Sequence, residues 1–158
     1  AVRGELRGLH VRRTQYVEPG ALAAELSTQQ LYAANAFLRC ATRVLVNACS
    51  FRAISFPQLE RAFRHHMVSL EPFLAPGTPV SVKVHARRSA LYHEAAIAER
   101  IGGWIQRDFP SSSSSGAPPE VLLSVFVDRD EFTVRVDSSG DPLHARSWHV
   151  DGTGIKMP

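Results

Sequence analysis

The chain has 158 residues, of which 44% are hydrophobic and 21% charged, and its formal net charge is +3. This balance is typical of a soluble globular protein and excludes disorder of the whole chain, and the length fits one domain or two small subdomains. No apolar run approaches the ~20 residues of a membrane-spanning helix, so we expect no membrane partner. Two cysteines are too few for a disulfide scaffold and favour a reducing, intracellular compartment.

Arginine supplies 16 of the 18 basic residues, since only Lys83 and Lys156 are lysines. The guanidinium group binds two acceptors at once and therefore suits phosphates and base edges. A GC-rich genome, which favours arginine codons, explains the same bias equally well. The composition alone leaves both explanations open.

The first 26 residues show no clear periodicity and are expected to be irregular, with one strand between Val11 and Val17. This segment is basic because a single acidic residue, Glu5, lies among several arginines. These are Arg3, Arg7, Arg12 and Arg13.

Ser27 and Gln30 have the spacing of a capping box, in which each side chain accepts a hydrogen bond from the other residue's backbone N–H. Apolar residues then recur every three or four positions, which predicts a helix over residues 28–43. Cys40 lies on this apolar stripe and is expected to be buried. A short strand should follow over residues 44–51.

A second helix is expected over residues 55–67, with Ser55 as its cap and Pro57 in the first turn, where a missing N–H is harmless. Strict alternation over residues 80–85 predicts a strand with one buried face. An apolar stripe predicts a third helix over residues 92–107.

Residues 110–119 contain five consecutive serines and nearby prolines. We expect a surface loop there rather than a domain boundary, because the strands on either side are needed for one sheet. A hairpin is predicted over residues 121–136 with its turn at residues 128–130. Helices and strands thus interleave, which predicts an α/β (α+β) fold with a mixed sheet flanked by helices.

The sequence carries no catalytic or cofactor motif. It lacks a G-x-S-x-G nucleophile elbow, a Walker or G-x-G-x-x-G phosphate loop, and an H-E-x-x-H or C-x-x-C metal motif. Its seven histidines are scattered, and Cys49 is expected to be structural. We therefore expect no catalytic residue, no metal and no cofactor in this chain.

Hydrogen-bond donors gather where the strand over residues 80–85 gives way to the next helix. Helix N-termini favour phosphate through their free N–H groups, and basic side chains would add charge there. A solvated loop with ordinary surface arginines explains the same residues. The candidates at this joint are Lys83, Arg87, Arg88, Ser89 and His93.

A second set of polar and aromatic residues lies near the C-terminus, at Arg146, Trp148 and His149. An aromatic ring beside cations suits stacking on unpaired RNA bases. Packing of Trp148 in the core is the alternative.

Three segments carry a family resemblance in combination: LYAANAFLRCATRVL at residues 31–45, SALYH leading into AIAER at residues 89–100, and VDSSGDPLHAR at residues 136–146. In this order they resemble the THUMP-containing N-terminal region of the RNA methyltransferases that modify guanine N2 in 23S ribosomal RNA. The match covers roughly residues 14–156. The family's RGYR stretch reads Arg-Ser-Trp-His at residues 146–149 here.

The resemblance implies an incomplete ferredoxin-like subdomain over residues 1–70, lacking the family's first strand and helix before residue 14. A THUMP module over residues 71–150 and a linker over residues 151–158 would follow. THUMP modules bind structured RNA and deliver it to a separate catalytic domain. In the family the S-adenosylmethionine site lies beyond the equivalent of this C-terminus, so the resemblance predicts no catalysis by the chain itself.

We therefore expect an RNA-binding module, with ribosomal RNA preferred over tRNA, in the cytoplasm or in an organelle such as a mitochondrion or chloroplast. The alternative is a structural or assembly subunit, for example of an organellar ribosome. It would contact ribosomal proteins through exposed Trp104 or Trp148. The residues expected to bind RNA are Lys83, Arg87, Arg88, Ser89, His93 and Arg146, with Arg12 and Arg13 as weaker candidates.

Overall fold

The computed structural model describes residues 1–74, 78–109, 120–140 and 142–143. These fall into two compact units. The N-terminal unit contains residues 1–44 together with Pro142 and Leu143, and the sheet unit contains residues 45–140. The predicted mixed α/β fold is confirmed.

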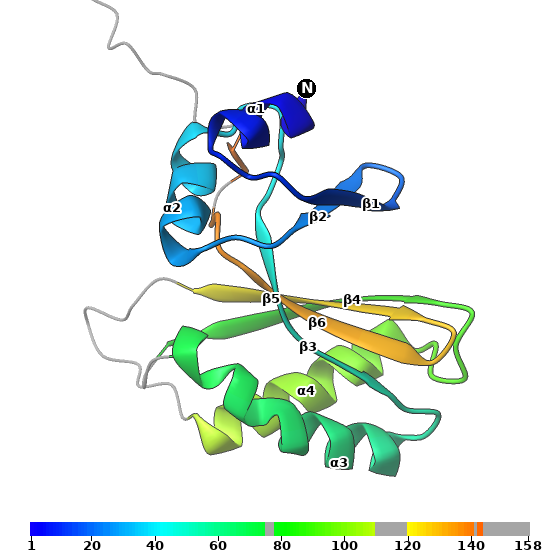
Figure 1. Cartoon of the computed structure of the whole chain (residues 1–158). Helices are drawn as coiled ribbons and strands as arrows, with labels where there is room; N and C mark the ends of the chain where they lie inside the picture. The colour runs from blue at the N-terminus through cyan, green and yellow to red at the C-terminus, as the bar shows by residue number, and fades with distance from the viewer. Residues whose placement is uncertain (75–77, 110–119, 141, 144–158) are drawn as a thin grey trace, which may run out of the picture. The chain divides into compact units, whose positions relative to one another are not determined.

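The N-terminal unit combines two helices with a small antiparallel sheet (Figure 1). Helix α1 (Val2–Gly8) precedes strands β1 (Thr14–Glu18) and β2 (Ala21–Ala24), and helix α2 (Thr28–Phe37) follows. The turn between the strands uses Gly20, whose φ of 84° lies in the left-handed region that glycine adopts without strain.

The expectation of an irregular start is wrong, because α1 forms there, whereas the strand expected between Val11 and Val17 corresponds to β1. Leu6 of α1 and Val11 are both buried, and they pack with the α2 residue Ala34. Glycines and arginines interrupt the short helical pattern of α1, which is why the sequence does not reveal it. Leu38 and Leu143 also belong to this small core.

Helix α2 begins as predicted but ends six residues before residue 43. The capping box is present: the Ser27 hydroxyl accepts from the Gln30 N–H at 3.2 Å, and the Gln30 amide oxygen accepts from the Ser27 N–H at 3.0 Å. At the other end the Glu5 carboxylate accepts the backbone N–H groups of Arg39 and Cys40 at 3.2 Å each, and the chain leaves the helix. Cys40 is therefore exposed, and the expectation that it is buried is wrong.

The sheet unit is a four-stranded mixed sheet in the order β3-β6-β5-β4 (Figure 1). Strands β4 and β5 are parallel and joined through α4, whereas β6 runs antiparallel to both of its neighbours. Two single-turn 3₁₀ helices, Met67–Ser69 and Glu71–Phe73, follow α3. The main elements in chain order are β3 (Leu45–Arg52), α3 (Phe56–His66), β4 (Val80–Arg87), α4 (Glu94–Asp108), β5 (Val121–Asp128) and β6 (Glu131–Asp137).

The predicted elements of this unit are confirmed to within two residues, and so is the hairpin turn at residues 128–130. Pro57 lies in the first turn of α3, but the Ser55 side chain makes no capping bond. The Gln58 side-chain oxygen instead accepts from the Ile54 N–H at 3.1 Å. The division of the chain also differs from the expected boundary at residue 70, because β3 pairs along its length with β6 and so belongs with the later strands.

Helices α3 and α4 cover one face of the sheet, and the core lies between them and the strands (Figure 1). Its largest fully buried side chains include Phe63 of α3, Ile101 of α4 and Phe132 of β6. Trp104 is only 8% exposed and packs against Phe63, so its expected role as an exposed contact anchor is wrong. Cys49 is half-buried, and burial raises the pKa of its thiol to about 11, which fits a structural role.

Candidate nucleic-acid interface

The face of the sheet opposite the helices is lined by polar and basic side chains. Along β4, Lys83, His85 and Arg87 are exposed, whereas Val84 between them belongs to the core. Successive side chains of a strand point to opposite faces, so the three donors share the face that α3 and α4 leave uncovered. The strict alternation that predicted this strand therefore also separates its apolar from its basic residues.

Register extends this polar face across the neighbouring strands. His85 lies opposite Phe126 on β5, and their ring centroids are 5.4 Å apart. The Arg135 guanidinium of β6 lies 4.3 Å from the centroid of the same Phe126 ring, a cation–π contact. Next to them, the Ser50 hydroxyl of β3 bonds to Thr133 at 3.3 Å. The face thus combines cations, an aromatic ring and hydroxyl groups.

Three connections meet at one end of this sheet: the β3–α3 connection, the β4–α4 loop and the β5–β6 turn. We call this region the loop end, residues 52–53, 87–93 and 128–131. The Arg129 N–H donates to the Arg87 carbonyl at 3.3 Å, and the Ala53 N–H donates to the Asp130 carbonyl at 3.0 Å. These backbone bonds hold the β5–β6 turn against both of the other connections.

The Asp130 carboxylate joins the same segments through its side chain. It accepts the Ala90 N–H at 2.7 Å and the Ser89 hydroxyl at 3.0 Å, and it lies 4.0 Å from the Arg52 guanidinium. The hydrogen bond from the Ala90 N–H, followed by that from Ser89, lowers the pKa of Asp130. The carboxylate therefore stays ionised and holds the β4–α4 loop in place.

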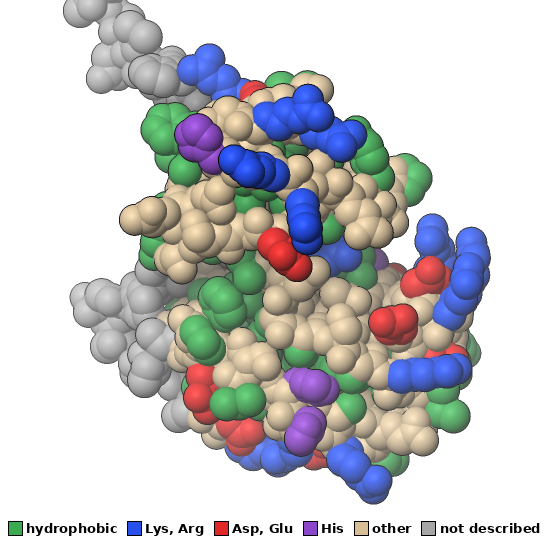
Figure 2. All heavy atoms as spheres, viewed as in Figure 1, with side chains coloured by type: hydrophobic (Ala, Val, Ile, Leu, Met, Phe, Trp, Pro, Cys, Tyr) green, Lys and Arg blue, Asp and Glu red, His purple; other side chains and the backbone are tan. Residues whose placement is uncertain are grey.

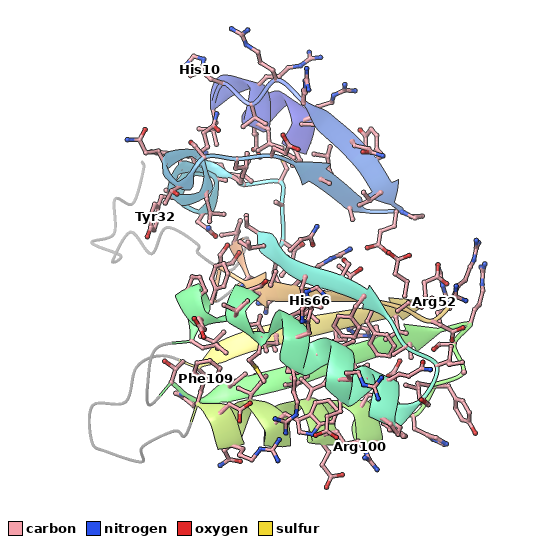
Figure 3. All side chains as sticks on the ribbon, turned by 60° about the horizontal axis from the view of Figure 1, so that its bottom comes forward. His10, Tyr32, Arg52, His66, Arg100 and Phe109 are labelled. Atoms are coloured by element: carbon pink, nitrogen blue, oxygen red, sulfur yellow. The ribbon has the colours of Figure 1, made fainter. Side chains whose placement is uncertain are left out.

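The loop end carries four arginines that come from all three of its segments, namely Arg52, Arg87, Arg88 and Arg129. Figure 2 shows basic and acidic side chains gathered together at this end of the sheet unit. Arg87 has a side chain 69% exposed and lies 3.8 Å from Asp128. Within the part of the chain that the structure describes, Arg88 and Arg129 are exposed and have no acidic partner within 4.0 Å. Figure 3 labels Arg52 at the end of β3. Of these four arginines, Arg88 and Arg129 therefore have guanidinium groups available to an external anion.

The predicted joint residues have different roles in the structure. Arg87 ends β4 and Arg88 follows it in the left-handed region, with φ of 52°. Ser89 bonds to Asp130 and so builds the loop, while exposed His93 is the N-cap residue of α4, with its ring 4.1 Å from that of Tyr92. Lys83 lies on the polar sheet face rather than at the loop end.

The N-terminus of α4 offers less to a phosphate than the sequence indicated. Glu94 is in its first turn, and the Glu94 carboxylate accepts the Ala86 N–H of β4 at 2.7 Å. A negative side chain at this position already complements the helix dipole and would repel a phosphate. The arginines of the loop end, Arg88 and Arg129 foremost, therefore form a more favourable anion site than the helix end.

The remaining predicted residues lie elsewhere or outside the described residues. Arg12 and Arg13 are exposed between α1 and β1 in the N-terminal unit. Arg146, Trp148 and His149 lie outside the described residues, as do the serine-rich segment 110–119 and the expected linker.

Sequence analysis missed Arg52, Arg129 and Asp130. A signal was present, since a parallel β4–β5 pair, had it been predicted, would have placed the end of β4 and the β5–β6 turn at the same edge of the sheet. The parallel pairing itself was not predicted, so the two segments were never brought together.

Two other kinds of site are absent from the described residues. No group of three or more histidine, cysteine or acidic side chains in these segments is placed to hold a metal ion. Among these segments, no helix has both the length and the apolar character that crossing a membrane requires.

Comparison with known proteins places the chain beside methyltransferases, although no protein-family model matches it. It is 28% identical over 153 residues to the ribosomal RNA large subunit methyltransferase K/L of Syntrophotalea carbinolica, a match that covers 94% of this chain and 21% of that protein. It resembles the structure of a predicted N6-adenine-specific DNA methylase from Listeria monocytogenes with a TM-score of 0.75 and 25% identity, over 99% of this chain and 41% of that one. TrmN from Thermus thermophilus shares the fold, with a TM-score of 0.58, 17% identity and coverage of 78% and 36%.

The chain is therefore related to methyltransferases, among them one named for large-subunit ribosomal RNA, which confirms this part of the predicted resemblance. It spans less than half the length of each of these proteins.

Proposed function

We propose that this chain is an RNA-binding module of the THUMP type and that its ligand is ribosomal RNA. In this proposal the sheet unit is the THUMP module and the N-terminal unit is the ferredoxin-like part. The observation that carries it is the loop end: four arginines from three connections, in a chain homologous to part of a ribosomal RNA methyltransferase.

The chemistry of the loop end supports a phosphate ligand. Guanidinium groups bind phosphate oxygens in pairs, and such charge-assisted hydrogen bonds are about twice as strong as neutral ones. The polar sheet face continues the cationic surface through Lys83 and His85. Binding through phosphates and shape makes affinity fall with salt.

We further propose that methyl transfer belongs to a part of the relatives that this chain does not cover, since it spans 21% of the K/L protein. A cytoplasmic or organellar location and contacts with ribosomal proteins remain proposals. A purely protein-docking role is less favoured because Trp104 is buried.

The test is RNA binding by the purified chain at two salt concentrations, with a structured 23S ribosomal RNA fragment and a tRNA. Replacing both Arg87 and Arg88 by alanine should weaken binding about tenfold, because each charge-assisted phosphate bond contributes ~1 kcal/mol or more. The control replaces Arg61 and Arg64 of α3, which removes the same charge from the helix layer and should change affinity less than twofold.

Absence of binding to either RNA would contradict the function itself. Equal losses in the two double variants would mean that binding depends on total charge and would contradict the assignment of the site to the loop end.

A further inference from the structure

The β5–β6 turn holds an arginine in a conformation that arginine disfavours. Asp128 pairs with Glu131, which leaves a two-residue hairpin loop of Arg129 and Asp130. Their φ values are 50° and 65°, so both are left-handed and the turn is type I′. Asparagine and glycine favour these two positions, whereas a long side chain is strained there.

Asp130 has a structural reason to occupy its position. Aspartate tolerates the left-handed region better than most residues, and its carboxylate ties the turn to Ser89 and Ala90. No comparable reason exists for Arg129 among the described residues. The hydrogen bond that Arg129 makes to the Arg87 carbonyl uses its backbone N–H, which any residue but proline supplies. Among the described residues, its guanidinium has no acidic partner within 4.0 Å.

Arg88 repeats the same combination on the neighbouring loop. It is exposed, its φ is 52°, and no ion pair involves it within the described segments. The Arg129 N–H bond to the Arg87 carbonyl places the two loops side by side. Of the four non-glycine residues with positive φ in the described chain, three therefore lie at the loop end and two of these are arginines.

We propose that Arg88 and Arg129 are held in strained conformations because together they bind neighbouring phosphates of an RNA backbone. This inference rests on the proposed RNA-binding function and names the residues and ligand groups of that site. Strained non-glycine residues persist where the surroundings fix them, and they concentrate at ligand sites. Asp128 and Asp130 are already engaged with Arg87, Ser89 and Ala90, which leaves these two guanidinium groups to the ligand.

The test is the variant Arg129→Asn, which removes the guanidinium and places at this position a residue that type I′ turns favour. If the strain at Arg129 serves binding, this substitution should raise the stability of the fold and lower the affinity for RNA. The thermal midpoint should rise by about 2 °C. Affinity for the 23S fragment should fall about five- to tenfold, and the slope of log affinity against log salt should decrease by about 0.7–0.9.

Arg61→Gln is the matched control, since it removes one positive charge from an exposed position of α3 and should leave the affinity within twofold. Arg129→Lys keeps the charge but not the guanidinium fork and should recover only part of the affinity. An Arg129→Asn variant with a higher midpoint and unchanged affinity would overturn the assignment of Arg129. A lower midpoint would overturn the claim of strain. Failure of the unaltered chain to bind RNA would instead contradict the proposed function.

Discussion

The two units differ in how they hold their arginines. In the N-terminal unit, Arg12 and Arg13 lie in a connection between α1 and β1, and among the described residues no hydrogen bond ties residues 12–13 to another segment. At the loop end, backbone bonds and the Asp130 carboxylate fix the segments that carry the arginines. Two segments with the same positive charge therefore need not bind an anion equally well, because a side chain on a fixed segment loses less entropy when it binds.

The two units also differ in the size of their apolar cores. Among the described residues, the core of the N-terminal unit contains five buried apolar residues, whereas that of the sheet unit contains eighteen. A larger core supports rigid loops, and the sheet unit is the better scaffold for a preformed site.

The largest expected effect tests this difference between the cores. Phe132→Ala removes a fully buried ring from the centre of the sheet and should lower the free energy of unfolding by about 3–5 kcal/mol. Leu6→Ala removes a smaller side chain from the smaller core and should cost about 2 kcal/mol.

Urea unfolding measures both losses, and hydrogen exchange locates them. Reduced protection of β3–β6 amides is expected in Phe132→Ala, and of α1 and α2 amides in Leu6→Ala. A larger loss for Leu6→Ala would reverse the ranking of the two cores.

The parts of the fold and of the candidate site that could be predicted from the sequence are those set by residues close together along the chain. Local signals were sufficient for the Ser27–Gln30 capping box, the alternation of β4 and the hairpin turn, and these are confirmed. The end of α2 depends on Glu5, more than thirty residues away, and was missed for that reason. Asp130 joins Ala90 across forty residues. Arg87 and Arg88 could therefore be predicted from the sequence, whereas the groups that fix their segments could not.

A second prediction asks whether arrangement or total charge governs binding. Asp130→Gly keeps the type I′ turn, since glycine favours that position, but removes the carboxylate that holds Ser89 and Ala90. Simple electrostatics predicts tighter RNA binding when a negative charge is lost. We expect the opposite, an affinity about fivefold lower with a shallower salt dependence.

Glu131→Gln is the control, because it removes the same charge from the next residue and should leave affinity unchanged or slightly higher. Asp130→Asn keeps one side-chain oxygen as an acceptor and should restore part of the affinity. Tighter binding by Asp130→Gly would show that total charge determines the affinity. The proposed advantage of arginines on fixed segments would then be wrong.

The smallest effect is the pH dependence that Asp130 confers on the sheet unit. Its pKa is lowered in the folded state by the Ala90 N–H and the Ser89 hydroxyl, whereas the unfolded chain keeps a value of about 3.9. The ionised carboxylate therefore stabilises the fold fully above about pH 5 and loses this contribution as the pH falls through the lowered folded-state value. The difference in free energy of unfolding between the unaltered chain and Asp130→Asn should accordingly be constant near neutral pH and shrink in acid.

Urea titrations from about pH 7 down to about pH 3 measure this difference. Arg52→Ala separates the causes, since the 4.0 Å contact of an exposed guanidinium contributes little beside two hydrogen bonds. Most of the pH-dependent difference should survive in that background. A difference that grew in acid would require a raised pKa for Asp130, and the carboxylate would then not be the group that holds the loop end together.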